Sequence, residues 1–297
     1  MRTDAGTTAA IMTELEDLFS VRRILVALDP STPGTALLDA AVEFANRIEA
    51  ELEGLFVEDI DLMRLAELPF AHELSLPTGL PQPLDLASME REMRMLAAGA
   101  RRMLETRARE MHVRCSFRVV RGRIEAEVRA AADTADLVIL DRAGATVTRH
   151  VRLKSIAGQA AKGAPHSVLL LRGVQAAIGS VVVVCDGTAA SDRALAAAAR
   201  LGSRLRRAGE TGITVLCLGD TRAAAQRAEQ KARDALQREG IVATFRTLAG
   251  ASPAGLAAAL RLPADVLLVL SAELPLIAFE EGERFLADSE GPVLLVR

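Results

Sequence analysis

The residues Arg23-Ile24-Leu25-Val26-Ala27-Leu28-Asp29 form an apolar run that ends in an acid. A second run of the same form, Ser180-Val181-Val182-Val183-Val184-Cys185-Asp186, follows about half a chain later. Each half also ends on an apolar strand closed by an arginine, at Ser167–Arg172 and at Pro292–Arg297. The simplest interpretation is a chain that contains two copies of one domain.

Short apolar strands alternate with helical patterns along both copies. Strands are expected near 23–28, 52–57, 115–120, 136–140 and 167–171, then near 180–185, 213–218, 242–247, 265–270 and 292–296. Helices are expected near 34–49, 87–111, 123–134 and 155–163, then near 189–207, 221–239, 252–261 and 278–288. Such alternation predicts an α/β fold of two tandem domains, each with a five-stranded parallel sheet and helices on both faces. Each strand-end aspartate then lies at the carboxyl edge, where such sheets bind ligands.

The domain boundaries follow from the repeat. Residues 1–21 form an amino-terminal extension, 22–172 the first domain, 173–179 a linker between glycines, and 180–297 the second domain. The extension carries Ile11, Leu15, Leu18 and Phe19 at helical spacing, which predicts a short amphipathic helix that docks on the body. We also expect the strands 168–171 and 293–296 to lie antiparallel to each other where the two sheets meet.

The first half contains an insertion, residues 60–86, that the second half lacks. Its four prolines, at positions 69, 77, 81 and 83, predict an irregular segment without a periodic apolar face and with fast amide exchange. Because it leaves the carboxyl end of the second strand, it could act as a lid over a ligand. A surface flap or a dimer contact is the alternative interpretation, and the sequence leaves both open.

Composition excludes several classes of function. The net charge of −3 and the absence of Trp and Tyr argue against nucleic-acid binding. No uncharged apolar run is long enough to span a bilayer, and the amino terminus lacks a secretion signal, so we expect no membrane association and a cytoplasmic protein. The three cysteines lie in strand-like runs without ligand spacing, which predicts buried small hydrophobes.

Motifs for catalysis are absent. The four histidines, His72, His112, His150 and His166, are scattered without the spacing of a metal site. No phosphate-binding Gly-x-x-x-x-Gly-Lys-Ser/Thr loop and no nucleophile elbow occur. The sequence therefore predicts neither an enzyme nor a resident metal.

Three further stretches carry a family resemblance, namely Leu55-Phe56-Val57-Glu58-Asp59, the ending from Ala164 to Arg172 and its shorter echo from Gly291 to Arg297. With the two strand-Asp openings, they make the chain resemble a tandem universal stress protein. The resemblance implies a fold like that of adenine nucleotide alpha hydrolases, with domains that pair through their last strands. It also implies ATP binding through a strand-end Asp, the backbone of the second strand and a Gly-x-x-Gly-x9-Gly-Ser/Thr loop. Carried over residue by residue, these features correspond to Asp29, Val57, Gly144 and Ser155.

The chain departs from the family loop at two positions. Asp141 and Lys154 stand where the resemblance expects glycines, and a β-carbon there obstructs the close approach of backbone to phosphate. Asp141 also adds negative charge beside a triphosphate, which Lys154 compensates only in part. The corresponding segment of the second half, Leu270 to Pro275, has no glycine, and acids follow it at 280, 281 and 283. Any single nucleotide is therefore expected in the first domain.

Two functions remain open at this point. The first is a cytoplasmic, non-catalytic stress-response or signalling module that forms an intrachain pseudo-dimer, acts on an unidentified protein partner and binds at most one ATP, with any accompanying Mg²⁺. The second is an ATP-binding protein with slow hydrolysis in the first domain. Loss of the glycines favours the first, and a homodimer is compatible with either.

Overall fold

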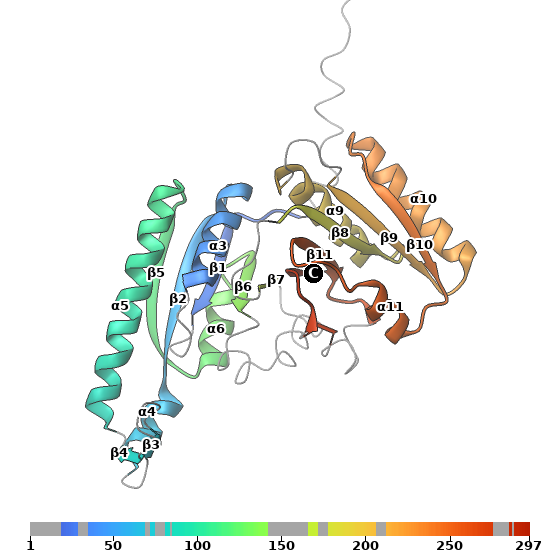
Figure 1. Cartoon of the computed structure of the whole chain (residues 1–297). Helices are drawn as coiled ribbons and strands as arrows, with labels where there is room; N and C mark the ends of the chain where they lie inside the picture. Colours follow the sequence, from blue (N-terminus) through green and yellow to red (C-terminus); the bar gives the residue numbers. More distant parts are fainter. Residues whose placement is uncertain are drawn as a thin grey trace, which may run out of the picture.

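The computed structural model of the chain forms an α/β fold around one twisted sheet (Figure 1). It describes residues 19–28, 35–68, 72–74, 81–83, 85–141, 166–171, 178–205, 212–275, 285–286 and 288–297. The predicted α/β class, with a mostly parallel sheet between helices, is confirmed. Three of the four candidate residues, Asp29, Gly144 and Ser155, lie outside the described residues, as does Lys154.

The sheet has ten strands in the order β10-β9-β8-β11-β12-β7-β6-β1-β2-β5. The first half of the chain contributes β1 (Arg23–Leu28), β2 (Glu51–Asp59), β5 (Cys115–Gly122), β6 (Leu137–Asp141) and β7 (Ser167–Leu171). The second half contributes β8 (Ser180–Cys185), β9 (Ile213–Gly219), β10 (Thr244–Ala249), β11 (Val266–Ser271) and β12 (Val293–Val296). Neighbouring strands within each half are parallel, which agrees with their nearly continuous apolar runs.

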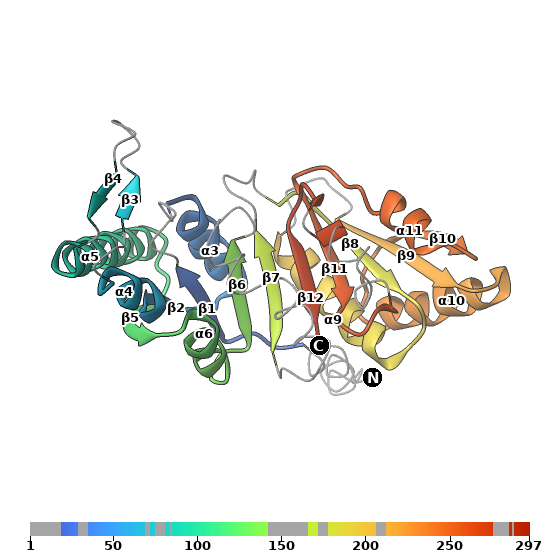
Figure 2. The same cartoon turned by 90° about the horizontal axis from the view of Figure 1, so that it is seen from below.

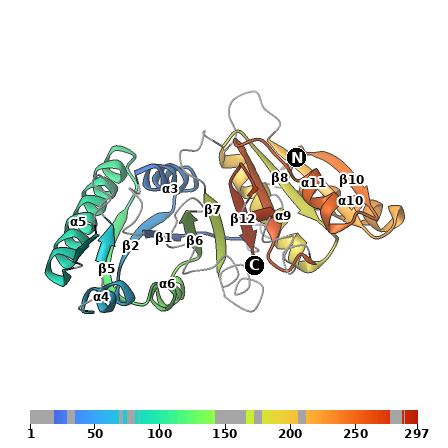
Figure 3. The same cartoon turned by 60° about the horizontal axis from the view of Figure 1, so that its bottom comes forward.

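The two halves join through β7 and β12, which are antiparallel, as predicted. Figure 3 shows the two strands side by side at the middle of the sheet. Leu169 is paired with Leu294 at the centre of this contact, and both side chains are fully buried. A second tie lies between helices α3 (Thr35–Ile48) and α9 (Ala189–Leu205), which contact each other. There, Arg204 donates to the carbonyl of Ile48 over 2.7 Å. The sheet and its helical cover are therefore continuous across the chain.

Helices cover both faces of the sheet because successive strand residues point to opposite sides. One apolar cluster packs alternate residues of β1, such as Ile24 and Val26, with α3, α9, α5 (Leu86–Glu110) and α10 (Arg222–Arg238). The other cluster packs Leu25 and Ala27 with α6 (Ile124–Ala132) and α11 (Pro253–Ala259). Both clusters draw residues from both halves.

The long helix α5 lies at one end of the sheet, over β2 and β5. Its start is fixed by Asp85, whose carboxylate accepts a hydrogen bond from the backbone N–H of Ser88 over 2.9 Å. The helix lies close to β2 because Gly54 has no side chain, since a β-carbon there would lie 2.8 Å from Leu104 Cδ2. α5 is therefore held by its inner face, and its opposite face points away from the sheet.

The insertion differs from its prediction. Residues Ile60–Ala66 form helix α4 rather than an irregular segment, and α4 buries Met63 and Ala66 against its neighbours. The prolines of the insertion all lie after this helix, so none interrupts it. Beyond α4, β3 (His72–Leu74) pairs with β4 (Pro81–Pro83) in a small hairpin beside the first turn of α5, away from the ends of β6 and β7 (Figure 2).

Several predicted segments fall partly outside the described residues. Of the amino-terminal extension the structure describes only its end, where Phe19 and Val21 are buried and Arg200 donates to the carbonyl of Phe19 over 3.4 Å. The helices expected near 155–163 and 278–288 are outside it, except for residues 285–286 and 288. Among the helices that are described, none has the length and apolar character that crossing a membrane requires.

The antiparallel contact generates a stability prediction. Leu294→Ala removes a fully buried side chain at the β7–β12 pair, and we expect it to lower the free energy of unfolding by about 2–5 kcal/mol. Val242→Ala is the control, because Val242 is 77% exposed and its truncation should change stability by less than about 0.5 kcal/mol. Urea unfolding followed by circular dichroism measures both, and equal midpoints for the two variants would contradict the assigned junction.

Candidate functional site

The carboxyl edge of the first half brings together the ends of β1, β2 and β6. The described part of the ladder between β1 and β2 reaches the pair Leu28 and Phe56, and β2 runs on to Asp59. Val57 follows Phe56 in β2, where it is paired with Val120 of β5, and its side chain is buried. The use of its backbone for binding a ligand stays a prediction.

Asp141 lies at the same edge. It is the last residue of β6, and the register of β6 with β1, in which Val26 faces Ile139, brings Asp141 level with Leu28. Leu28 immediately precedes Asp29 in the sequence. An acid therefore stands at the end of β6, next to the strand end where the sequence analysis expects the ligand-binding acid.

An ion-pair network spans the ends of β2 and β5. The nearly buried carboxylate of Glu58 accepts a hydrogen bond from Nε of Arg121 over 3.0 Å, and Arg121 also pairs with Glu90 of α5 over 3.2 Å. The hydrogen bond from Arg121 to Glu58 raises the pKa of the arginine. A buried carboxylate needs such a partner, because desolvation without one is costly. Sequence reasoning missed this network, since its members are far apart in the chain and follow no motif.

The start of the insertion is tied to the same edge. Asp59 is buried at the end of β2 and accepts a hydrogen bond from the backbone N–H of Asp61 over 3.0 Å, which caps α4. Asp61 in turn pairs with Arg123, which precedes α6, over 3.3 Å. These contacts place α4 beside the ends of β2 and β5 and not over the ends of β1 and β6.

In the second half, the corresponding aspartate is used within the fold. Asp186 accepts hydrogen bonds from the backbone N–H of Thr188 over 3.0 Å and from its hydroxyl over 2.6 Å. Gly187, between them, has a φ of 82°, a conformation that glycine adopts without strain. Lys231 then donates to the carbonyl of Gly187 over 3.0 Å and to Asp192 over 2.7 Å. The turn after β8 is thus closed by its own Asp186 and Thr188 and by Lys231 of α10 (Arg222–Arg238).

The end of β11 is closed in the same way. The buried hydroxyl of Ser271 accepts from the backbone N–H of Glu273 over 3.1 Å. The Glu273 carboxylate pairs with Arg193 of α9 over 2.8 Å, so a side-chain bridge connects the ends of β8 and β11. This bridge lies where the resemblance would place the phosphate-binding segment of the second half, and no glycine there exposes its backbone.

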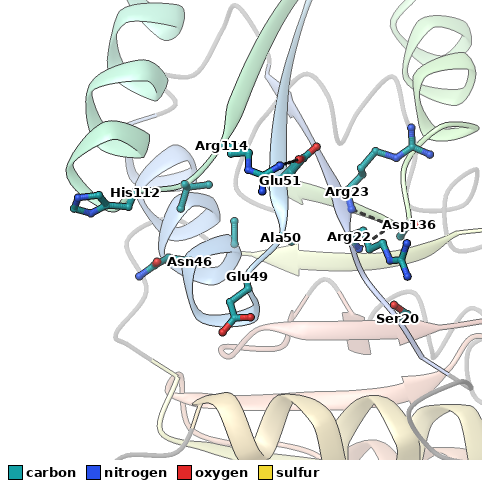
Figure 4. Close-up of a pocket in the computed structure, with 12 residues that line it drawn as sticks. Ser20, Arg22, Arg23, Asn46, Glu49, Ala50, Glu51, His112, Arg114 and Asp136 are labelled. Atoms are coloured by element: carbon teal, nitrogen blue, oxygen red, sulfur yellow. Dashed lines mark hydrogen bonds and ion pairs between the residues drawn. The ribbon is translucent and has the colours of Figure 1, made fainter. Parts of the chain in front are cut away.

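A hollow of about 890 Å³ lies at the opposite, amino edge of the first half (Figure 4). There the Asp136 carboxylate accepts from the backbone N–H groups of Arg22 and Arg23, over 2.8 and 2.9 Å, and Arg114 pairs with Glu51 over 2.8 Å. These contacts tie together the starts of β1, β2, β5 and β6. The hollow was not predicted from the sequence, because its lining comes from four separate segments and contains no motif.

Neither cysteines nor metal-binding groups form a site in the described part of the chain. No cluster of three or more His, Cys, Asp or Glu residues there could hold a metal ion. Cys185 and Cys217 are buried, as predicted, whereas Cys115 at the edge strand is only half-buried. Burial raises the pKa of the Cys217 thiol to about 12 and that of Cys185 well above its usual range. Both are therefore neutral thiols that pack in the core.

Comparison with known proteins gives a family match over the first half. A model of the universal stress protein family matches residues 20–172. No curated protein matches the chain significantly.

Solved structures resemble the chain along nearly its whole length. A universal stress protein from Archaeoglobus fulgidus DSM 4304 has a TM-score of 0.63 at 16% identity, over 93% of this chain and 96% of that one. A putative universal stress protein from Pseudomonas aeruginosa UCBPP-PA14 has a TM-score of 0.52 at 16% identity, over 97% and 94%. The cytoplasmic domain of a prokaryotic cation chloride cotransporter has a TM-score of 0.51 at 12% identity, over 93% and 95%. At these identities the likeness shows the fold alone.

The cysteine environments generate a reactivity prediction. The thiolate is the reactive form, and at pH 8 a thiol with a pKa of about 12 is almost fully protonated. We expect a thiol reagent such as dithionitrobenzoate to label one cysteine per native chain, Cys115, and to do so slowly because burial also raises the pKa of that thiol. All three should react in guanidinium chloride, and rapid labelling of Cys185 or Cys217 in the native protein would contradict their burial.

Proposed function

The chain belongs to the universal stress protein family, and we propose that it is a non-catalytic, cytoplasmic stress-response and signalling module that binds one adenine nucleotide. The single observation that carries the proposal is the difference between the two carboxyl edges. In the second half, the strand-end acid Asp186 is bonded to Thr188, and the bridge between Arg193 and Glu273 occupies the edge. In the first half, the polar contacts described at the end of β2 run from Glu58 to Arg121 of β5 and from Asp59 to the start of α4, on the side away from β1.

The proposed site lies in the first half and consists of Asp29, Val57, Gly144 and Ser155. The strand-end carboxylate of Asp29 would accept hydrogen bonds from the ribose or from the adenine amino group. The backbone of Val57 would contact the base, and the segment from Gly144 to Ser155 would hold the phosphates. The order of strands supports this assignment, since it brings the ends of β1, β2 and β6 side by side.

We further propose that the second half is a degenerate copy of the first. The domains, 22–172 and 180–297, would form an intrachain pseudo-dimer, separated by the linker 173–179. The matching strand orders in the two halves and the antiparallel contact of β7 with β12 support this. The degenerate copy then supplies the pairing partner that a single domain would take from another chain.

Charge at the first edge supports binding without turnover. Phosphoryl transfer is accelerated by cationic groups that stabilise the charge on the transferred phosphoryl group. Asp141 instead adds a carboxylate at the end of β6. Any Mg²⁺ would bind together with the nucleotide. A protein partner would bind differently to the nucleotide-bound and the nucleotide-free chain.

Calorimetry with ATP and Mg²⁺ tests the site and its stoichiometry. We expect the wild type to bind one ATP per chain and Asp29→Ala to lose that binding, because the variant removes the acceptor for the nucleoside. Asp186→Ala is the matched control, since it removes the equivalent strand-end acid of the second half and should leave one ATP bound. Two ATP per chain, or equal affinity in all three proteins, would refute the assigned site.

The glycine substitutions of the family loop give a second test. The double variant Asp141→Gly and Lys154→Gly removes one negative charge, one positive charge and two β-carbons from the phosphate path. We expect ATP affinity to increase and the rate of phosphate release to stay at background. Steady phosphate release by the wild type that Asp29→Ala abolishes would favour slow hydrolysis over a pure binding role.

A further inference from the structure

Helix α5 exposes a face that nothing in the described chain covers. Its inner face buries Met93, Ala97, Leu104 and Ala108. The opposite face carries residues spaced alternately by four and three, so that they form one straight stripe along the helix. The stripe consists of Ser88, Glu92, Met95, Gly99, Arg102 and Thr106.

Two features of the stripe are unusual for a solvated helix face. Met95 is 64% exposed, although burial of a methionine side chain is more favourable than its exposure to water. One turn further on, a β-carbon added to Gly99 would meet nothing within 4 Å, so the glycine does not serve packing inside the chain. It costs helix stability, about 1 kcal/mol relative to alanine. The exposed side chain of Met95 and the unfilled space at Gly99 thus lie side by side on the same surface.

The stripe is complementary to itself when it is reversed. In two antiparallel copies of α5 that cross at the level of Ala97, Met95 of one copy faces Gly99 of the other. At the same time Glu92 faces Arg102, and Ser88 faces Thr106. Because the arrangement is symmetric, each of these contacts occurs twice.

The positions that flank the stripe obey the same symmetry. On one side, Leu96 meets Leu96 of the second copy, and it is 39% exposed in the single chain. On the other side, Arg91 meets Glu105 of the second copy. Flanking positions of an antiparallel helix pair set its orientation through such contacts, because like charges there would repel.

The charged groups of this face are available for a partner. Within the part of the chain that the structure describes, no ion pair is formed by Glu92, Arg102, Arg91 or Glu105. Their neighbours on the same helix differ in this respect, since Glu90 pairs with Arg121 and Arg107 pairs with Asp39. The unpaired charges are those that the reversed copy would match.

We propose that a second copy of this chain binds here, through antiparallel contact of the two α5 helices about a two-fold axis at Ala97. The contact is isologous, so it closes with two chains. It is separate from the β7–β12 pair, which is already used within one chain, and it does not depend on nucleotide binding. A contact through the stripe of one helix per chain buries less area than a standard interface, so we expect a weak and reversible dimer.

Sedimentation velocity of the full chain over a range of concentrations tests the proposal. We expect a monomer–dimer equilibrium for the wild type. Arg102→Glu places two acids opposite each other at both symmetric positions and should weaken the dimer by about tenfold or more, as should Glu92→Arg. The double variant Glu92→Arg with Arg102→Glu swaps the two charges, so opposite charges face each other again, and it should restore the wild-type equilibrium.

Controls distinguish a contact through the stripe of α5 from a general effect of surface charge on association. Arg227→Glu makes the same charge change on an exposed position of α10 and should leave the equilibrium unchanged. Circular dichroism establishes that each variant keeps its helices. A wild type that stays monomeric, single variants that dimerise like the wild type, or a double variant that fails to recover would each overturn the proposed contact.

Discussion

The antiparallel pair of β7 and β12 is the constraint on which the rest of the structure depends. A parallel sheet with helices on both faces still has two open edges, and open edges pair with other chains. Here the inner edge of each half is consumed by the other half. Leu169 and Leu294 are fully buried there, and both apolar clusters run through the contact. In the part of the chain that the structure describes, β5 and β10 are consequently the two outer strands of the sheet.

The sequence predicts most of this fold because buried parallel strands are nearly continuous apolar runs that end at a polar residue. The beginnings and ends of β7 and β8, for example, follow directly from their apolar runs. Helix α4 was missed for a physical reason. It has only two turns and buries only Met63 and Ala66, so its periodic signal is weaker than the proline signal that follows it. Its cap, Asp59, was visible in the sequence but also fitted the end of a strand.

The candidate site is less predictable than the fold. Asp29 and Asp186 close equivalent apolar runs in the sequence, and the three-dimensional surroundings of Asp186 show that this acid is used within the fold. Its turn is closed by Lys231, and the adjacent edge by Arg193 with Glu273; both interactions connect segments far apart in the chain. Side chains that meet across a sheet edge leave no local pattern. The network of Glu58 with Arg121 is a second case, because the two charges belong to neighbouring strands that are not consecutive.

The two outer ends of the sheet differ in a way that limits assembly. α5 covers the β5 end and exposes Met95 and Leu96, whereas α10, which covers the β10 end, exposes polar residues such as Gln226 and Gln230. If both ends carried self-complementary stripes, chains would join end to end without closing. If only one end carries such a stripe, a two-fold contact buries the stripe of both chains, and no stripe is left for a third chain. The divergence of the two halves therefore restricts the proposed ligand to one edge and also restricts the proposed contact between chains to a closed pair.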